Sequence, residues 1–203
     1  MDSDTTRRLI LLRHAKSDWP DVPDRDRPLA KRGRRDAPRI GRWLHEHGYQ
    51  PDVVVVSAAT RTRQTWDLVA PELGGLPAVH FEPRAYAASA LTLLYLAQEL
   101  PDRYRTALLI AHNPGLSELA TSLAAPPESD RAAGPESDRA AGPSSTGPSS
   151  TGPAATGPAV KDSPRPAISL PTAAVAVFEF PGTWPSLTPA HARLISLTTP
   201  ADL

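Results

Sequence analysis

Leu9-Ile10-Leu11-Leu12-Arg13-His14-Ala15-Lys16 is the stretch that decides the fold of this chain. Its four consecutive aliphatic residues predict a short strand buried on both faces, because such strands are continuously apolar rather than alternating. The run stops at an arginine and a histidine, and open α/β sheets bind ligands at the carboxyl ends of their strands. Alone, the stretch is also explained as an ordinary strand with a polar flank, but the arrangement recurs twice further on.

Composition narrows the class of protein. The chain has 203 residues, enough for one sizeable core. Its 22 basic and 22 acidic residues balance, so no global field favours nucleic acid or a membrane as partner. The absence of cysteine excludes disulfides, thiolate metal sites and cysteine nucleophiles. The first apolar run is too short for a signal peptide or a membrane span, so we expect a soluble cytoplasmic protein.

Apolar runs alternate with helical patterns along the rest of the chain. Such alternation at short spacing is typical of a doubly wound, mostly parallel sheet. We therefore predict one α/β domain over residues 1–203, built as three αβα layers. The predicted strands cover residues 9–12, 53–56, 79–82, 106–111, 172–180 and 192–197, and the predicted helices cover residues 33–47, 60–73, 89–100 and 114–123. Ser57 or Thr60 is the expected cap of the second helix, and Ser89 is the expected cap of the third. The third helix is expected to bury Leu91, Leu94 and Tyr95, with Leu96 as a further candidate, and the four tryptophans are expected to be packing residues.

Residues 125–167 have low complexity. The sequence PESDRAAG occurs twice in succession, at 127–134 and 135–142, and GPSST, GPSST and GPAAT follow it. Because the segment has almost no large apolar side chains to offset the entropy of ordering, we predict a disordered insertion. Closure entropy grows slowly with loop length, so one domain tolerates such an insertion. A docking segment is the functional alternative.

Three predicted strands are followed by polar side chains suited to one task. In a parallel sheet the carboxyl ends of these strands share one edge, so two histidines and two arginines are expected to converge there. Two guanidinium groups beside helix N-termini form a receptor for a dianionic phosphoryl group. A neutral imidazole in that receptor is able to act as a nucleophile. The residues concerned are Arg13, His14, Ser57, Arg61 and His112.

Three motifs in this order resemble the histidine phosphatase superfamily, also called the phosphoglycerate mutase-like superfamily. Arg13-His14-Ala15 is similar to its Arg-His-Gly/Ala signature, residues 57–65 (SAATRTRQT) resemble its second motif, and residues 111–114 (AHNP) resemble its third. Asp26-Arg27-Pro28-Leu29 followed by Gly33 is similar to a segment of the short phosphohistidine phosphatases, the SixA-type branch. The resemblance covers residues 7–123 and resumes at Leu170.

The resemblance implies a phosphoglycerate mutase-like fold and a phosphatase that forms a phosphohistidine intermediate. It makes His14 the nucleophile and places Arg13, Arg61 and His112 around the phosphoryl group, with Ser17 in the phosphate-binding segment. Transfer of this kind needs mainly positioning and electrostatic stabilisation, so the resemblance implies neither a metal nor a cofactor.

The chain departs from the family pattern at two positions. Pro20 stands where many members carry an asparagine that binds phosphate. The usual acid soon after the third strand is not clearly placed: Glu82 is the nearest carboxylate and Asp18 a weaker candidate, and each is also explained as a solvated surface charge. The imidazole of a phosphohistidine is a good leaving group that needs little protonation, so a missing acid favours a phosphoramidate over a sugar phosphate.

Three functions remain open at this point. The first is hydrolysis of phosphohistidine on a protein, with small phosphomonoesters as alternative substrates, because little chain follows Arg61 that could cap the site. The second is a catalytically weak module that binds phosphorylated partners. The third, a metal-dependent hydrolase using His14 and His112, is poorer because no carboxylate has metal-ligand spacing near either histidine.

Overall fold

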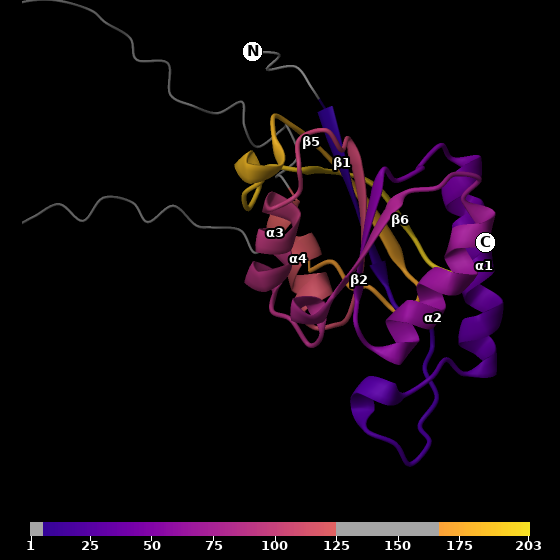
Figure 1. Ribbon diagram of the computed structural model, residues 1–203. Coiled ribbons are helices and arrows are strands. Elements are labelled where there is room, and N and C mark those ends of the chain that lie inside the picture. Colours follow the sequence, from indigo (N-terminus) through magenta and orange to yellow (C-terminus); the bar gives the residue numbers. More distant parts are fainter. Residues whose placement is uncertain (1–5, 125–166) are drawn as a thin grey trace, which may run out of the picture. The chain divides into compact units, whose positions relative to one another are not determined.

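A mixed sheet of six strands lies at the centre of the fold (Figure 1). The computed structural model describes residues 6–124 and 167–203, which belong to one compact unit. The strand order is β3-β2-β4-β1-β5-β6; the first four of these are mutually parallel, and β5 is antiparallel to both β1 and β6. The strands are β1 (Thr6–Arg13), β2 (Val53–Ser57), β3 (Ala78–Glu82), β4 (Thr106–Ala111), β5 (Val175–Pro181) and β6 (Arg193–Thr198).

Helices cover both faces of this sheet, which confirms the predicted three-layer αβα architecture. One pair packs together on one face and a second pair on the opposite face (Figure 1). The predicted insertion falls, apart from its last residue, outside the described residues. The first pair is α1 (Lys31–Glu46) with α2 (Thr60–Val69), and the second is α3 (Ala90–Gln98) with α4 (Gly115–Leu123).

Strand β1 is buried on both faces, as predicted. Leu9 and Leu11 pack into the core beneath α3 and α4, whereas Ile10 and Leu12 pack into the core beneath α1 and α2. All four are at most 1% exposed. Each side chain of this size contributes about 1.5–3 kcal/mol on burial. Because β1 lies between β4 and β5, both edges of its backbone are also paired, so its last residue, Arg13, is held firmly.

The boundaries of α1 and α2 differ from the prediction. Helix α1 begins two residues earlier than predicted and carries Pro38 in its interior. Helix α2 ends at Val69, and a short 3₁₀ turn that contains Pro71 continues to Glu72. The predicted cap of α2 by Ser57 or Thr60 is wrong, because the cap position is Ala59 and makes no side-chain hydrogen bond.

Helix α3 is capped as predicted, but its buried face agrees with the prediction only in part, at Leu94 and Leu96. The Ser89 hydroxyl accepts a hydrogen bond from the Thr92 amide at 3.2 Å. Leu91 and Tyr95, predicted to be buried, are 55% and 52% exposed. Apolar residues occupy almost the whole circumference of this helix, so their spacing does not specify which face meets the sheet. The face that does so carries Leu93, Leu94, Leu96 and Ala97.

The chain returns beside α4 after the undescribed stretch. The Thr121 hydroxyl accepts a hydrogen bond from the Ile168 amide at 2.8 Å, and the Ser117 hydroxyl accepts one from the Leu170 amide at 3.0 Å. β5 begins at Val175, three residues later than predicted, because Ala173 has a positive φ of 60° and turns the chain first. The return segment is therefore fastened to the helix that follows β4.

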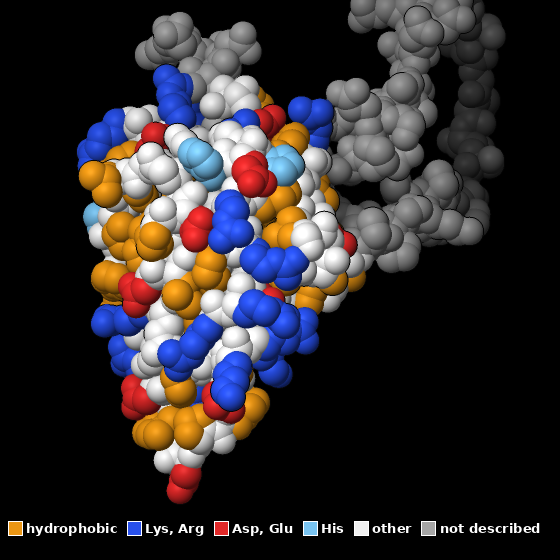
Figure 2. Space-filling view, turned by 90° about the vertical axis from the view of Figure 1, so that its right-hand side faces the viewer, with side chains coloured by type: hydrophobic (Ala, Val, Ile, Leu, Met, Phe, Trp, Pro, Cys, Tyr) orange, Lys and Arg blue, Asp and Glu red, His pale blue; other side chains and the backbone are white. Residues whose placement is uncertain are grey.

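Figure 2 shows Lys and Arg side chains gathered on the face that α1 and α2 form. Asp36 lies beneath three of the arginines of α1 and is buried. Its carboxylate is 2.9 Å from Arg35, 3.3 Å from Arg32 and 3.9 Å from Arg39. A buried carboxylate thus offsets part of the positive charge that α1 carries.

None of the helices in residues 6–124 and 167–203 is long and apolar enough to cross a membrane. Three of the four tryptophans are buried, as predicted for packing residues. Trp19 is the exception, since it is 75% exposed and lies over the guanidinium of Arg27.

Candidate active site

The carboxyl ends of β1, β2 and β4 bring two histidines and two arginines to one edge of the sheet. The parallel register aligns Leu12 with Ile110 and Ile110 with Val56, so the residues that follow these strands are neighbours. The rings of His14 and His112 lie with their centroids 5.2 Å apart. Both rings feel the positive charges of Arg13 and Arg61. All of these side chains except Arg13 are buried.

His14 is held as a neutral ring with one free nitrogen. Its Nδ1 lies 2.8 Å from the backbone carbonyl of Ala15, and since a carbonyl accepts, Nδ1 carries the hydrogen. Burial lowers the pKa of His14 to about 3; His112, Arg61 and Arg13 act in the same direction, and the bond to Ala15 opposes them. At neutral pH, Nε2 therefore presents an unprotonated lone pair.

His112 is also neutral and is held by a hydroxyl. Its Nε2 lies 2.7 Å from Oγ of Ser57, the last residue of β2. Burial lowers the pKa of His112 to about 4, with Arg61 the next cause, while the carboxylate of Asp24 opposes the shift. Tyr86 packs edge-on against the ring, with the centroids 5.6 Å apart.

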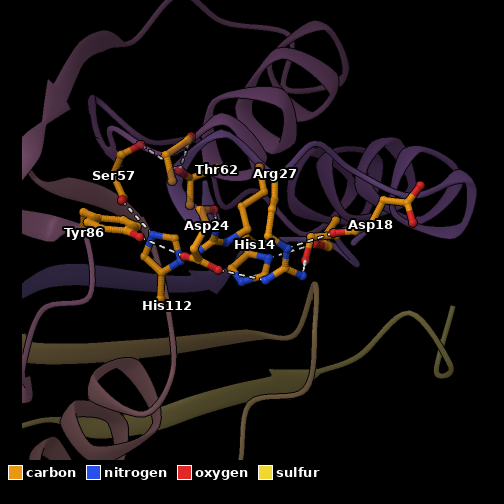
Figure 3. A network of polar contacts seen from close by, with 12 residues as sticks. His14, Asp18, Asp24, Arg27, Ser57, Thr62, Tyr86 and His112 are labelled. Carbon is orange, nitrogen blue, oxygen red and sulfur yellow. Dashed lines mark hydrogen bonds and ion pairs between the residues drawn. The ribbon is translucent and has the colours of Figure 1, made fainter. Parts of the chain in front are cut away.

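Asp24 gathers three donors at the mouth of the site (Figure 3). Its Oδ2 accepts from the Tyr86 hydroxyl at 2.8 Å and from Arg61 Nη2 at 3.0 Å, and its Oδ1 accepts from Arg27 Nη1 at 2.8 Å. The hydrogen bond from Tyr86, followed by that from Arg27, holds the pKa of Asp24 well below its usual range. Asp24 thus remains a carboxylate and orients Arg61.

Arg27 ties the predicted phosphate-binding residue Ser17 into this network. Its Nη2 donates to the Ser17 hydroxyl at 3.0 Å, and its Nε donates to the Asp18 carbonyl at 2.9 Å. Ser17 is therefore connected to Arg61 through Arg27 and Asp24. The loop over residues 17–28 is closed on itself by a buried guanidinium.

Arg13 is held by a residue that follows the undescribed stretch in the sequence. Its Nη1 donates to the Leu170 carbonyl at 2.9 Å, and Asn113 Nδ2 donates to the same oxygen at 2.9 Å. The Ser117 hydroxyl accepts from the Leu170 amide at 3.0 Å and donates to Asn113 Oδ1 at 3.0 Å. Asn113 and Ser117 thereby fix both polar groups of Leu170, and Leu170 fixes Arg13.

The structure does not join Glu82, the tentative acid, to these residues. Its carboxylate accepts from the Arg84 amide at 2.8 Å and from Arg84 Nη2 at 2.9 Å, and Arg84 holds the pKa of Glu82 below its usual value. The Asp18 carboxylate, the weaker candidate, accepts from the amide of Trp19 at 3.0 Å. Among the residues described, no group of three metal-ligating side chains could hold a metal ion.

Sequence reasoning missed Asp24, Tyr86 and Leu170. The spacing of Asp24 and Arg27 carried one usable signal, because an acid and a base three residues apart in a short turn are able to pair. Tyr86 follows β3 without any motif, and Leu170 acts through its backbone. Neither position has a side-chain pattern that would have identified it.

Comparison with known proteins agrees with this geometry. Residues 9–85 match the family model described as the histidine phosphatase superfamily (branch 1). Protein Rv1276c of Mycobacterium tuberculosis is 32% identical over 190 residues, which cover 93% of this chain and 99% of the relative. A chloroplastic protein of Arabidopsis thaliana is 37% identical over 131 residues, or 59% of this chain; the match spans 60% of that relative's length.

Solved structures share the fold, and one of them supports the same family. The putative phosphohistidine phosphatase SixA of Nakamurella multipartitia is 28% identical, with 98% of this chain and 99% of that chain covered and a TM-score of 0.71. The protein histidine phosphatase SixA complexed with tungstate shares the fold at 16% identity, with coverages of 96% and 98% and a TM-score of 0.66. The chain therefore belongs to the histidine phosphatase superfamily, in its SixA-type branch, and is a phosphatase of the kind that uses a histidine nucleophile.

Proposed function

We propose that this phosphatase hydrolyses phosphohistidine on another protein, with His14 as its nucleophile. The observation that carries the choice of nucleophile is the bond from His14 Nδ1 to the Ala15 carbonyl at 2.8 Å. That bond leaves Nε2 as a lone pair on a ring that feels the charges of Arg13 and Arg61, whose guanidinium groups suit the oxygens of a phosphoryl group.

The reaction proceeds in two displacements. In the first, His14 Nε2 forms a bond to phosphorus as the bond from phosphorus to the substrate imidazole breaks; the leaving nitrogen keeps the electron pair and takes a proton from solvent. In the second, water attacks phosphorus, the bond to Nε2 breaks, and the ring recovers its lone pair. Inorganic phosphate leaves and the proton of the water passes to solvent.

The side chains around His14 supply positioning and charge. Arg13 and Arg61 would bind the oxygens of the transferring group, and His112 would donate to the same group. Such groups stabilise the transition state because they are already oriented before the reaction begins. Ser17 would contribute through Arg27, whose guanidinium it binds.

The substrate class follows from the state of the nearby carboxylates. Asp24 is kept ionised by Tyr86, Arg27 and Arg61, and Glu82 is kept ionised by Arg84. Neither is therefore poised to protonate an alkoxide leaving group at neutral pH. An imidazole leaves without such help more easily than a sugar hydroxyl, so the site favours a nitrogen–phosphorus bond.

The surroundings of the site suit a substrate attached to a protein. Within residues 58–77, α2 passes through one 3₁₀ turn towards β3 without a long insertion that would cover the site. The loop carrying Asp24 projects beyond the sheet in Figure 1, and its Trp19 is exposed. An exposed aromatic side chain beside a phosphate site is available for contact with a protein surface.

A direct comparison of substrates tests the proposal. A protein phosphorylated on histidine by phosphoramidate and a set of small phosphomonoesters are incubated with wild type and with His14→Ala, in the presence of EDTA. We expect release of phosphate from the phosphorylated protein by wild type, a labelled phosphoenzyme in acid-free quench, and neither with His14→Ala. Hydrolysis confined to phosphomonoesters overturns the substrate assignment, and label retained in His14→Ala overturns the nucleophile.

A further inference from the structure

The hydroxyl of Ser57 and the ring of His112 meet where two adjacent strands end. Ser57 is the last residue of β2, His112 directly follows β4, and these strands pair in parallel. Ser57 is completely buried, and its Oγ lies 2.7 Å from His112 Nε2. Since both residues are anchored by the central sheet, this contact has little freedom to rearrange.

The direction of this hydrogen bond follows from the count of hydrogens. Within the described residues, His112 Nε2 is the polar partner of the Ser57 hydroxyl, and no second acceptor lies within bonding distance. If Nε2 carried a hydrogen, the hydrogen of the Ser57 hydroxyl would be buried without an acceptor, at a cost of roughly 1–3 kcal/mol. The favourable arrangement has Ser57 donating to an unprotonated Nε2.

The opposite nitrogen of His112 then carries the hydrogen. Because the ring is neutral, it holds one hydrogen, and Nε2 is occupied as an acceptor. Nδ1 is buried and has no partner in residues 6–124 and 167–203. In Figure 3 the ring of His112 lies between Ser57 and His14. A buried donor without a partner inside a catalytic site calls for a functional explanation.

We propose that Ser57 is a positioning residue that fixes His112 as the Nδ1–H tautomer, so that His112 serves as a neutral hydrogen-bond donor to the transferring phosphoryl group. This inference rests on the proposed function and deepens it. The hydrogen stays on Nδ1 throughout, and the bond strengthens as charge shifts on the phosphoryl oxygens.

The two histidines of the site are then both Nδ1–H tautomers, but they present opposite nitrogens to the phosphoryl group. In His14, Nδ1–H donates to a backbone carbonyl, which leaves Nε2 as a lone pair. In His112, Nε2 accepts from a hydroxyl, which leaves Nδ1–H as a donor. Two similar rings 5.2 Å apart thereby perform different tasks. The partner of the second nitrogen decides which task each ring performs.

The tautomer itself is measured first, on the full chain with nitrogen-15-labelled histidine at pH 7. His112→Gln assigns the ring signals. We expect a protonated Nδ1 and an unprotonated Nε2 for His112 in wild type, and a protonated Nε2 to appear in Ser57→Ala. A protonated Nε2 in wild type overturns the inference. This measurement needs no turnover, so it decides the tautomer even if the proposed function fails.

Kinetics then test the consequence, with phosphoramidate as substrate. Ser57→Thr and Ser57→Val have the same shape and differ in the hydroxyl, so steric effects cancel between them. We expect phosphoenzyme formation to be about 10- to 100-fold slower in the valine variant than in the threonine variant, as for other groups that orient a functional histidine. KM should change far less than kcat. Equal rates, or a difference confined to KM, overturn the inference, whereas no turnover by wild type instead argues against the proposed function.

Discussion

Asp24 and Arg61 form an ion pair at the mouth of the site, with Oδ2 of Asp24 3.0 Å from Nη2 of Arg61. The backbone carbonyl of Asp24 accepts a second hydrogen bond from the same guanidinium. The loop after β1 and the start of α2 are thereby joined directly. A phosphoryl group that binds Arg61 has to share the guanidinium with a carboxylate already bound to it.

Removal of the Asp24 charge should strengthen the binding of phosphate. In Asp24→Asn, the backbone carbonyl still holds Arg61, but the repulsion between the carboxylate and the anion is gone. We expect inorganic phosphate to bind about 3- to 10-fold more tightly at low salt, or about 1 kcal/mol. Calorimetric titration at two ionic strengths provides the measurement.

The ion pair of Arg7 with Asp102 is a matched control for this substitution. Its length is 2.9 Å and the Asp102 side chain is 53% exposed, against 3.0 Å and 52% for the pair of Arg61 with Asp24. Asp102→Asn should leave phosphate affinity unchanged. Weaker phosphate binding in Asp24→Asn would mean that the carboxylate is needed to hold Arg61 in place.

The buried histidines should make stability depend on pH below neutrality. The pKa of His14 is lowered to about 3 and that of His112 to about 4, from an ordinary value of 6.5. Between pH 6.5 and these lowered pKa values, the unfolded chain binds more protons than the folded chain. The free energy of unfolding therefore falls as pH decreases from 6.5. Urea unfolding at pH 7, 5.5 and 4.5 measures this slope.

Substitution of both rings tests where that slope originates. His14→Gln combined with His112→Gln should flatten the loss of stability between pH 6.5 and pH 4. The same change at His80, which is exposed on β3, is the control and should leave the slope as in wild type. An unaltered slope in the double variant would show that other groups cause the acid sensitivity.

The support of Arg13 by Asn113 predicts a selective loss of substrate binding. Asn113→Asp keeps the shape of the side chain but replaces the donor to the Leu170 carbonyl with an acceptor. Leu170 should shift and misplace Arg13, and we expect KM for phosphoramidate to rise by about 5- to 30-fold, as for the loss of roughly 1–2 kcal/mol. Initial rates over a range of substrate concentrations give kcat and KM separately.

Gln98→Glu provides the matched control for this amide. Gln98 Nε2 also donates to a backbone carbonyl, that of Leu187, at 2.7 Å, but it does so on α3 away from the phosphate site. Its replacement should lower stability without raising KM. Similar KM values for both variants would show that Arg13 does not depend on Leu170.

Gly33 packs closely against the loop that follows the nucleophile. A Cβ at Gly33 would lie 2.2 Å from the carbonyl oxygen of Lys16, which is two residues from His14. Gly33→Ala should therefore push the loop after β1 away from α1, with a loss of about 2 kcal/mol or more in stability and a lower kcat. Thermal unfolding and turnover are measured together.

Gly75→Ala is the control for this substitution. A Cβ at Gly75 meets no atom within 4 Å, so the change should be neutral or slightly stabilising. If both alanine variants behave alike, the close approach of α1 to the loop does not constrain the site.

The parts of the site that follow strands directly could be predicted from the sequence, and the parts on loops could not. Arg13, His14 and His112 come immediately after continuous apolar runs, and parallel pairing places the ends of such runs at one edge. Asp24 and Tyr86 lie in connecting segments whose paths depend on tertiary packing. Their side chains are hydrogen-bonded although 62 residues separate them in the sequence, and no local sequence pattern predicts that contact.

The fold shows the same division at the level of whole elements. The apolar run at β1 was sufficient to predict a strand buried on both faces. For α3, where nearly every residue is apolar, spacing identified the helix but not its buried side, so Leu91 and Tyr95 were wrongly placed. The late start of β5 depended on the positive φ of Ala173, a backbone conformation that its sequence does not signal.

The hydrogen bond between Thr121 and Ile168 affects which changes in length the repeats tolerate. It holds Thr121 and Ile168 together on either side of the undescribed stretch, and Ala124 is bridged to Ala192 close by. Because these flanking residues are held together, the length of the segment between them is not set by a distance that it must span. Slippage during replication could add or delete a copy of PESDRAAG while the support of Arg13 by Leu170 stays as it is.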